Sequence, residues 1–273
     1  MDYLEEYQIA IPSYNRPHII KDKTLKLLKR LNIDNKQILI FVENEKQKEK
    51  YINHGLQEYN FITTSTQGIM EKRNFLETYY REQTQHDRVL YMDDDLDDIM
   101  ILDKKNPKIT VPIEEKEFKT FIVQAFNMTE YLNLSIFGVS ALHNPFYMSY
   151  NTTTNLKYIS GAFKGCVIRR DRHEIHTDID HFEDYQFSCE YYLRDRGVIK
   201  YNHISIKTDY FIEEGGICES MGGLQKRKDS MEPNSKYMQE RYGAMVNVVE
   251  KKWGKEIKLN WRYKINETAV KSV

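Results

Sequence analysis

The densest cluster of side chains that could do chemistry is an acidic turn at residues 93–98. The largely apolar run 88–92 ends abruptly at this turn, as is typical of a buried strand that delivers carboxylates at its carboxyl end. Asp93 and Asp95 form an Asp-x-Asp pair, and Mg²⁺ is usually held by one or two carboxylates together with substrate phosphates. The pair therefore indicates either a metal clamp for a nucleotide diphosphate or a plain solvated acidic turn.

A calcium loop of the EF-hand type is excluded by the same stretch. Asp93, Asp95 and Asp97 fit the first three ligand positions of such a loop. However, Asp98 stands where the loop needs glycine, and Lys104 stands where it needs glutamate.

A second pair of carboxylates, Glu183 and Asp184, falls in the first turn of an expected helix. The helix dipole stabilises acids there, which is a sufficient structural reason for both. A positioned carboxylate can also remove the proton of a hydroxyl group as the hydroxyl attacks. Beside a metal motif, Asp184 is the expected base.

The first 100 residues predict the scaffold that these acids need. Short apolar runs alternate with segments of helical periodicity, which predicts a mostly parallel sheet with helices on both faces. Ligands bind outside the carboxyl ends of the strands in such sheets. The expected strands are 7–11, 37–42, 61–63 and 88–92, and the expected helices are 20–31, 44–55 and 68–80.

The second half predicts a mixed set of elements. Asp178 is the expected cap of a helix that Gly197 closes, and Asn234 is the expected cap of a helix that carries Trp253. The glycines at 215–216 and 222–223 predict a mobile loop that ends in the basic triplet 226–228. The other expected elements are a helix at 118–129 and strands at 136–142, 158–169 and 204–210.

Composition sets the broad class of the protein. The 273 residues are 40% hydrophobic and 30% charged, which is typical of a globular chain. The net charge of −1 means that any contact with DNA must come from a local patch. No run approaches a membrane span, the start lacks the pattern of a signal peptide, and three cysteines without metal spacing favour a reducing compartment. We therefore expect a cytoplasmic location, in the host cytoplasm if the source is viral, and no membrane partner.

Four stretches occur in the order in which they occur in GT-A glycosyltransferases, and the chain resembles that family. Residues 9–16 resemble the opening strand and loop, and residues 67–74 resemble the glycine-then-Arg-Asn helix. Residues 93–95 match the metal motif, and residues 182–184 resemble the Glu-Asp pair that carries the base in inverting members. The chain also looks like the phage and kinetoplastid branch that attaches sugars to hydroxymethylated pyrimidines in DNA, the TET/JBP-associated glycosyltransferases.

The resemblance implies one GT-A domain over residues 1–273, a Rossmann-like, mostly parallel α/β sheet with a mixed C-terminal half. Residues 1–100 would bind the nucleotide sugar, and residues 101–273, with a C-terminal helix, would bind the acceptor. The implied activity is inverting transfer of a sugar, glucose for preference, from a UDP-sugar to a hydroxymethylpyrimidine in double-stranded DNA, with Mn²⁺ or Mg²⁺ as cofactor.

The resemblance and the chemistry of the side chains together assign the donor site. Gly68 permits close backbone approach at a helix N-terminus, and Arg73 carries a fork of donors suited to a diphosphate. Two structural interpretations remain open: residues 12–16 could be an ordinary strand-to-helix turn, and Arg73 could be a salt-bridged surface arginine. The expected donor-binding residues are Pro12, Ser13, Tyr14, Arg16, Glu43, Gly68, Arg73, Asp93 and Asp94, and the expected metal ligands are Asp93, Asp95 and His203.

The late part of the chain interleaves basic and aromatic residues. Such a patch can hold phosphates and stack a base, or it can be a solvated face over core aromatics. The expected acceptor residues are Lys226, Arg227, Lys228, Trp253, Trp261 and Arg262, with Asp184 and Glu183 as the catalytic pair.

Other functions compete with this hypothesis. The same enzyme could act on a glycan, a lipid-linked sugar or a protein. A sugar nucleotidyltransferase would need a glycine-rich basic signature after the first strand, whereas residues 12–17 contain no glycine. A binding module without catalysis would show no turnover with any acceptor.

Overall fold

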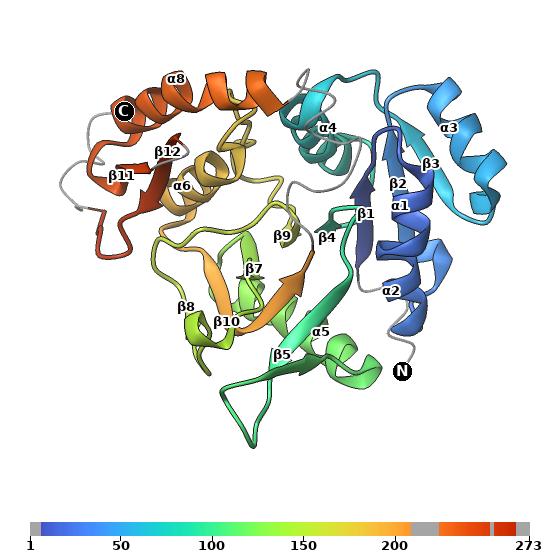
Figure 1. Cartoon of the computed structure of the whole chain (residues 1–273), viewed down its shortest axis with the longest axis horizontal. Helices are drawn as coiled ribbons and strands as arrows, with labels where there is room; N and C mark the ends of the chain where they lie inside the picture. Colours follow the sequence, from blue (N-terminus) through green and yellow to red (C-terminus); the bar gives the residue numbers. More distant parts are fainter. Residues whose placement is uncertain (1–6, 209–223, 252–253, 266–273) are drawn as a thin grey trace.

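The computed structural model describes residues 7–208, 224–251 and 254–265, without the side chains of residues 224–228. Within these ranges, ten strands form one sheet in the order β3-β2-β1-β4-β9-β7-β10-β5-β6, with β8 added alongside β10 (Figure 1). The strands are β1 (Gln8–Pro12), β2 (Ile38–Val42), β3 (Asn60–Thr63), β4 (Arg88–Met92), β5 (Asp98–Leu102), β6 (Thr110–Pro112), β7 (Ile136–Ser140), β8 (Thr152–Thr153), β9 (Phe163–Val167) and β10 (Ile199–Lys207).

The N-terminal part of the sheet is parallel and the rest is mixed. β1 runs parallel to β2 and to β4, so that Ala10 lies opposite Leu39 on one side and Tyr91 on the other. β9 then inserts antiparallel between β4 and β7, and β10 runs parallel to β7 but antiparallel to β5. The predicted α/β class with a mixed second half is confirmed. The carboxyl ends of β1, β2 and β4 share one edge, where Pro12, Val42 and Met92 lead into polar loops.

Alternate residues of each strand serve two hydrophobic layers, one on each face of the sheet. Ile9 and Ile11 pack on one face, and Ala10 packs on the other. The first face is covered by α1 (Pro17–Asp22), α2 (Thr24–Arg30), Tyr51 of α3 (Glu45–Tyr51) and α5 (Glu115–Tyr131). The second face is covered by α4 (Gly68–Glu82), α6 (Glu183–Asp195) and α8 (Leu224–Tyr242). The predicted helices on both faces are thus present.

Smaller elements complete the described chain. The hairpin of β11 (Val246–Lys251) and β12 (Gly254–Leu259) packs beside α8. No helix in the described ranges has both the length and the apolar character needed to cross a bilayer. The short helical turns are η2 (Asn35–Gln37), η3 (Ile52–Leu56), η4 (Pro145–Tyr147) and η5 (Gly243–Met245).

The expected start of α6 at Asp178 is wrong. The helix begins at Glu183, because the Asp178 carboxylate accepts hydrogen bonds from Gln186 Nε2 at 2.8 Å and Tyr237 Oη at 2.6 Å. Asp178 therefore ties the segment before α6 to α8, and it does not cap the helix.

The expected cap at Asn234 is also wrong. α8 already begins at Leu224 and continues past Pro233, and the Asn234 side chain donates to the His181 carbonyl oxygen at 3.3 Å. Residues 226–228 accordingly lie in the first turns of α8 and not in a loop. The helix ends at Tyr242, so the apolar residues after it belong to the β11–β12 hairpin, while Trp253 and the glycines at 215–216 and 222–223 lie outside the described residues.

Candidate functional site

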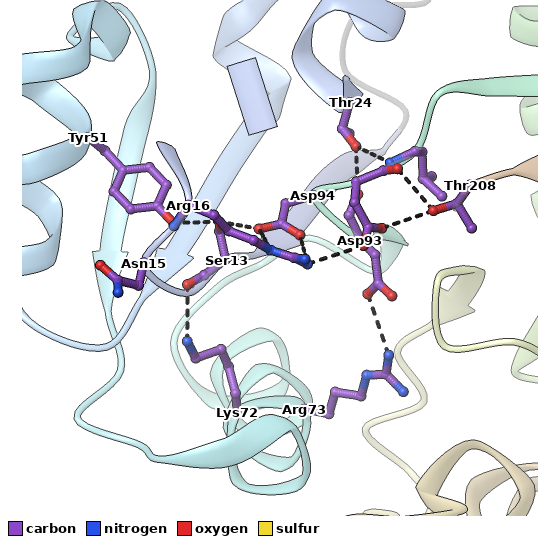
Figure 2. A network of polar contacts seen from close by, with 12 residues as sticks. Ser13, Asn15, Arg16, Thr24, Tyr51, Lys72, Arg73, Asp93, Asp94 and Thr208 are labelled. Atoms are coloured by element: carbon purple, nitrogen blue, oxygen red, sulfur yellow. Dashed lines mark hydrogen bonds and ion pairs between the residues drawn. The ribbon is translucent and has the colours of Figure 1, made fainter. Parts of the chain in front are cut away.

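The three consecutive aspartates after β4 have different surroundings. Asp94 is 1% exposed, and its carboxylate accepts from Arg16 Nε at 3.0 Å, from Arg16 Nη2 and from the Ser13 hydroxyl (Figure 2). Asp93 and Asp95 stay half-buried, with about one fifth of each side chain exposed. The middle acid thus locks the loop after β1 to the loop after β4, and the outer two remain accessible.

A chain of hydroxyl groups extends this lock to α3. Tyr51 Oη lies 2.6 Å from Ser13 Oγ and accepts from the Arg16 amide at 3.2 Å. Because Ser13 donates to Asp94, Tyr51 donates in turn to Ser13. Burial and the nearby Asp94 charge raise the pKa of Tyr51 above its ordinary value, so it remains a donor at neutral pH.

Two threonines fix the backbone of the acidic turn (Figure 2). Thr24 donates through its hydroxyl to the Asp93 carbonyl oxygen at 2.8 Å and accepts from the Leu96 amide at 2.9 Å. Thr208, just after β10, donates to the Asp95 carbonyl oxygen at 3.0 Å. These contacts satisfy backbone groups of the turn and hold the outer carboxylates in place.

The charges around Asp95 are strongly unbalanced. Burial and the negative charges of Asp94 and Asp93 raise the pKa of Asp95 to about 7. Arg16, whose Nη2 lies 3.3 Å from Asp95 Oδ2, offsets part of this repulsion. An additional cation at Asp93 and Asp95 would relieve the remainder.

Arg73, on α4, joins the acidic turn to the second pair of carboxylates. Its Nη2 lies 3.4 Å from Asp93 Oδ1, and its Nη1 forms an ion pair with Glu183. Burial lowers the pKa of Arg73, but Glu183, Asp93 and Asp184 raise it more, so the guanidinium stays charged. One arginine therefore bridges two acids that are 90 residues apart in the sequence and that were predicted to work together.

Gly161 makes room for this bridge. A Cβ atom at Gly161 would lie 1.9 Å from Arg73 Nη1, a distance that no side chain tolerates. The adjoining residue, Ala162, accepts from the Asp93 amide at 3.0 Å, so the same short segment also supports the acidic turn. Glycine is needed here because the Arg73 fork lies directly against the backbone.

The start of α6 aims its two acids in different directions. The preceding residue, Phe182, has a φ of 75°, which is uncommon for a residue with a bulky side chain. Glu183 is buried against Arg73, and burial raises its pKa to about 8 while Arg73 opposes this shift. Asp184 is half-buried and points its carboxylate to the Tyr158 hydroxyl, which donates to Oδ2.

Lys72 is a buried cation beside the loop after β1 that was not predicted from the sequence. Its Nζ donates to the Ser13 carbonyl oxygen at 3.2 Å (Figure 2). It also lies 5.6 Å from the centre of the Tyr14 ring. Burial lowers its pKa to about 8, opposed by the charges of Asp94 and Glu43. Glu43 also accepts from Gln47 Nε2 at 3.0 Å. Arg16 and Lys72 thus place two basic groups beside the acidic turn.

The N-terminus of α4 holds a carboxylate of the chain itself. Gly68 has a φ of +80°, and Asp180 Oδ1 lies 3.4 Å from the Met70 amide at this helix start. A Cβ on Gly68 would lie 3.2 Å from the same oxygen. Gly68 is thus needed by the turn, and Asp180 lies where an anion was expected.

The structure places His203 and Trp261 among aromatic and basic side chains. His203 packs against Tyr150 and Tyr201, with ring centres 6.1 and 6.2 Å away, five positions before Thr208 on the chain. It is not brought together with Asp93 and Asp95. Trp261 lies in the turn after β12, half-exposed, with Arg262 and Lys157 over its ring at 4.8 and 5.3 Å.

The acidic turn has carboxylates that could hold part of the shell of a metal ion. In the described part of the chain, no three acids, histidines or cysteines come close enough to hold a metal by themselves. Asp93 and Asp95 nevertheless keep accessible carboxylate oxygens in a turn with excess negative charge. Hard oxygen donors of this kind fit Mg²⁺ or Mn²⁺ when substrate phosphates complete the shell.

The site residues that were not predicted from the sequence share one property, because each is brought to the site by contacts with distant parts of the chain. Each of these residues contacts a segment far from it in the sequence. The residues are Lys72, Gly161, Tyr158 and Asp180, which contact Ser13, Arg73, Asp184 and Met70 respectively. The only local signal was Lys72, which directly precedes Arg73 in the stretch already singled out.

Comparison with known proteins gives structural neighbours only. No protein-family model and no curated protein sequence matches this chain. S. aureus TarS, residues 1–349, has a TM-score of 0.48 at 11% identity, over 86% of this chain and 73% of that one. M. tuberculosis glucosyl-3-phosphoglycerate synthase has a TM-score of 0.48 at 10% sequence identity, and the match covers 90% of this chain and 85% of that one. The mannosyltransferase PcManGT from Pyrobaculum calidifontis, in complex with GDP-Man and Mn²⁺, has a TM-score of 0.49 at 8% sequence identity. That match covers 86% of this chain and 64% of that one.

Proposed function

We propose that this protein is a glycosyltransferase of the GT-A type, which transfers a sugar from a nucleotide sugar to a hydroxyl group. The observation that carries the proposal is the Arg73 bridge. It connects the acidic turn at Asp93 to Glu183, next to Asp184, which supports a donor and a base in one site. A sugar donor held at the turn would present its anomeric carbon toward α6.

The donor side would bind a nucleotide diphosphate, with UDP as the proposed nucleotide. Asp93 and Asp95 would hold Mg²⁺ or Mn²⁺, and that ion would neutralise charge on the departing diphosphate. Arg16, Arg73 and Lys72 border the same turn and are placed to pair with phosphate oxygens.

Asp184 is the proposed base. Glu183 is paired with Arg73, so Asp184, whose Oδ2 accepts from the Tyr158 hydroxyl, is the carboxylate that would take the acceptor proton. A base on the side opposite the leaving group leads to inversion of the anomeric carbon. Glu183 would then act through Arg73, by holding the guanidinium toward the donor.

The proposed acceptor is a hydroxymethylpyrimidine in double-stranded DNA. Lys157 and Arg262 flank the half-exposed Trp261 ring, and Lys157 directly precedes Tyr158, the partner of Asp184. Cations beside an exposed aromatic ring suit a phosphate backbone and an unstacked base. Lys226, Arg227 and Lys228, in the first turns of α8, remain proposed contacts to the backbone.

Mass spectrometry of nucleosides tests this function. Hydroxymethylated duplex DNA is incubated with the protein, Mn²⁺ and a panel of nucleotide sugars, then digested to nucleosides. We expect a hexose added to the hydroxymethylpyrimidine with one donor, and no addition in the presence of EDTA. Transfer to free saccharides but not to the duplex would reject DNA as the acceptor. No transfer to any acceptor would reject the enzyme.

A further inference from the structure

The segment between β8 and β9 lies directly against the start of α6, and its contacts converge on Asp184. The Tyr158 hydroxyl donates to Asp184 Oδ2, and the Gly161 amide also donates to this carboxylate. The aromatic rings of Tyr158 and Tyr185 lie 4.4 Å apart, centre to centre. One short segment therefore contacts the acid through a side chain and through its backbone.

Two buried residues hold this segment in place. Ser188, one turn along α6, accepts from the Ile159 amide at 3.0 Å and donates to the Asp184 carbonyl oxygen at 2.6 Å. Lys200, on β10, donates from Nζ to the Tyr158 carbonyl oxygen at 3.0 Å. The carbonyl and the amide of the peptide group that joins Tyr158 to Ile159 are thus both held, which restricts the backbone that carries the phenol.

We infer that Tyr158 is the positioning residue of the Asp184 base, a role that rests on the proposed function. Its hydroxyl occupies one carboxylate oxygen and so fixes the rotation of the side chain, which directs the remaining proton-accepting capacity toward the acceptor. A carboxylate that is held before substrate arrives loses no free energy to reorientation during the reaction.

The hydroxyl group also favours the charged form of the acid. Burial raises the pKa of Asp184, whereas Arg73 and the hydrogen bonds from Tyr158 and from backbone amides lower it. The groups that face Asp184 are Arg73 from α4, Glu183 and Tyr185 from α6, and Tyr158 from the segment before β9. Among these, Tyr158 donates to the carboxylate through its hydroxyl, which can be removed with the ring left in place.

Tyr158→Phe is the direct test, with Tyr192→Phe as the matched control. Tyr192 lies on the same helix as Asp184, but its hydroxyl donates to the Tyr263 carbonyl oxygen at 3.0 Å, away from the site. We expect Tyr158→Phe to lower kcat about tenfold, to leave the donor KM unchanged and to move the acidic limb of the pH profile upward. Tyr192→Phe should move none of these.

A measurement without turnover separates this inference from the proposed function. The carboxyl carbon of Asp184, followed by NMR in aspartate-labelled protein, should titrate about one pH unit higher in Tyr158→Phe than in the wild type. Ser188→Ala, which loosens the segment and keeps the phenol, should give a smaller shift in the same direction. An unchanged titration in Tyr158→Phe would overturn the positioning role even if the enzyme transfers sugar. A shifted titration in a protein that transfers no sugar would support the contact and reject the function.

Discussion

Among single residues, the three aspartates of the turn show how identical side chains differ by position. Asp94 is enclosed by Arg16 and Ser13, whereas Asp93 and Asp95 keep accessible oxygens. The sequence predicted the outer pair as metal ligands and Asp94 as a contact to the donor. The burial of Asp94 followed from its pairing with Arg16, 78 residues earlier, and no local pattern encodes such a pairing.

Substitution of single aspartates should separate structure from function. Asp94→Asn is expected to lower the free energy of unfolding by about 3 to 5 kcal/mol, because it removes the buried carboxylate that pairs with both Nε and Nη2 of Arg16. Asp95→Asn should leave unfolding almost unchanged and abolish metal-dependent binding of UDP. Denaturant unfolding and calorimetry with and without EDTA measure the two effects. Equal losses of stability in both variants would contradict the division of roles.

Gly161 is a second position where one atom matters. Gly161→Ala should displace Arg73 from Glu183 and cost about 1 to 3 kcal/mol of stability, the usual range for overpacking. Arg73→Lys removes the branched fork, so the double variant should be less destabilised than the sum of the single variants. Thermal unfolding of the four proteins measures the coupling. Strict additivity would show that the alanine methyl group and the guanidinium do not meet.

At the scale of elements, the parallel half of the sheet was predictable because its strands are short apolar runs that end in polar loops. The strands β5 and β8, and the antiparallel insertion of β9, were not predicted, since strand order is set by contacts far apart in the sequence. The starts of α6 and α8 were misplaced for a related reason. Asp178 and Asn234 have the chemistry of helix caps, but tertiary hydrogen bonds use their side chains instead.

The contact between β10 and the segment before β9 should be sensitive to pH. Burial lowers the pKa of Lys200 to about 8 from its ordinary value near 10.5. Between these values the unfolded chain binds more protons than the folded one, so this residue adds stability as pH rises from about 8 to 10.5. Below pH 8 that contribution is absent, because the lysine is charged in both states.

Lys200→Met removes this dependence. Relative to the variant, the wild type should gain on the order of 1 to 3 kcal/mol of unfolding free energy between pH 8 and pH 10. Denaturant unfolding at the two pH values measures the gain, and Lys207→Met, at the exposed end of the same strand, serves as the control. A constant difference between wild type and variant would mean that Lys200 keeps an ordinary pKa.

At the scale of the whole molecule, Arg262 and Lys157 lie over the Trp261 ring, and Lys157 directly precedes Tyr158, which donates to Asp184. The net charge of −1 gives no general attraction to DNA, so binding depends on such local groups. The sequence showed Trp261 and Arg262 as a pair, but it could not show that Lys157 joins them from a segment 100 residues earlier.

Trp261→Ala should raise the KM for a hydroxymethylated duplex about tenfold, since stacking on an aromatic ring contributes about 1 to 3 kcal/mol per base. kcat and the donor KM should stay near their wild-type values. Tyr131→Ala, which removes a more exposed ring at the end of α5 (84% against 51% for Trp261), is the control. Steady-state kinetics at two salt concentrations decides the matter, and equal effects of both substitutions would remove Trp261 from the acceptor site.

The anomeric configuration of the transferred sugar tests the central claim most directly. With a donor of α configuration, proton NMR of the isolated product should show the large H1–H2 coupling of a β-glucoside. Asp184→Asn should lower the rate of its formation at least about a hundredfold, while Glu190→Gln on the same helix should not. An α-linked product, or an Asp184→Asn variant with full activity, would contradict a site in which Asp184 deprotonates the acceptor opposite the departing nucleotide.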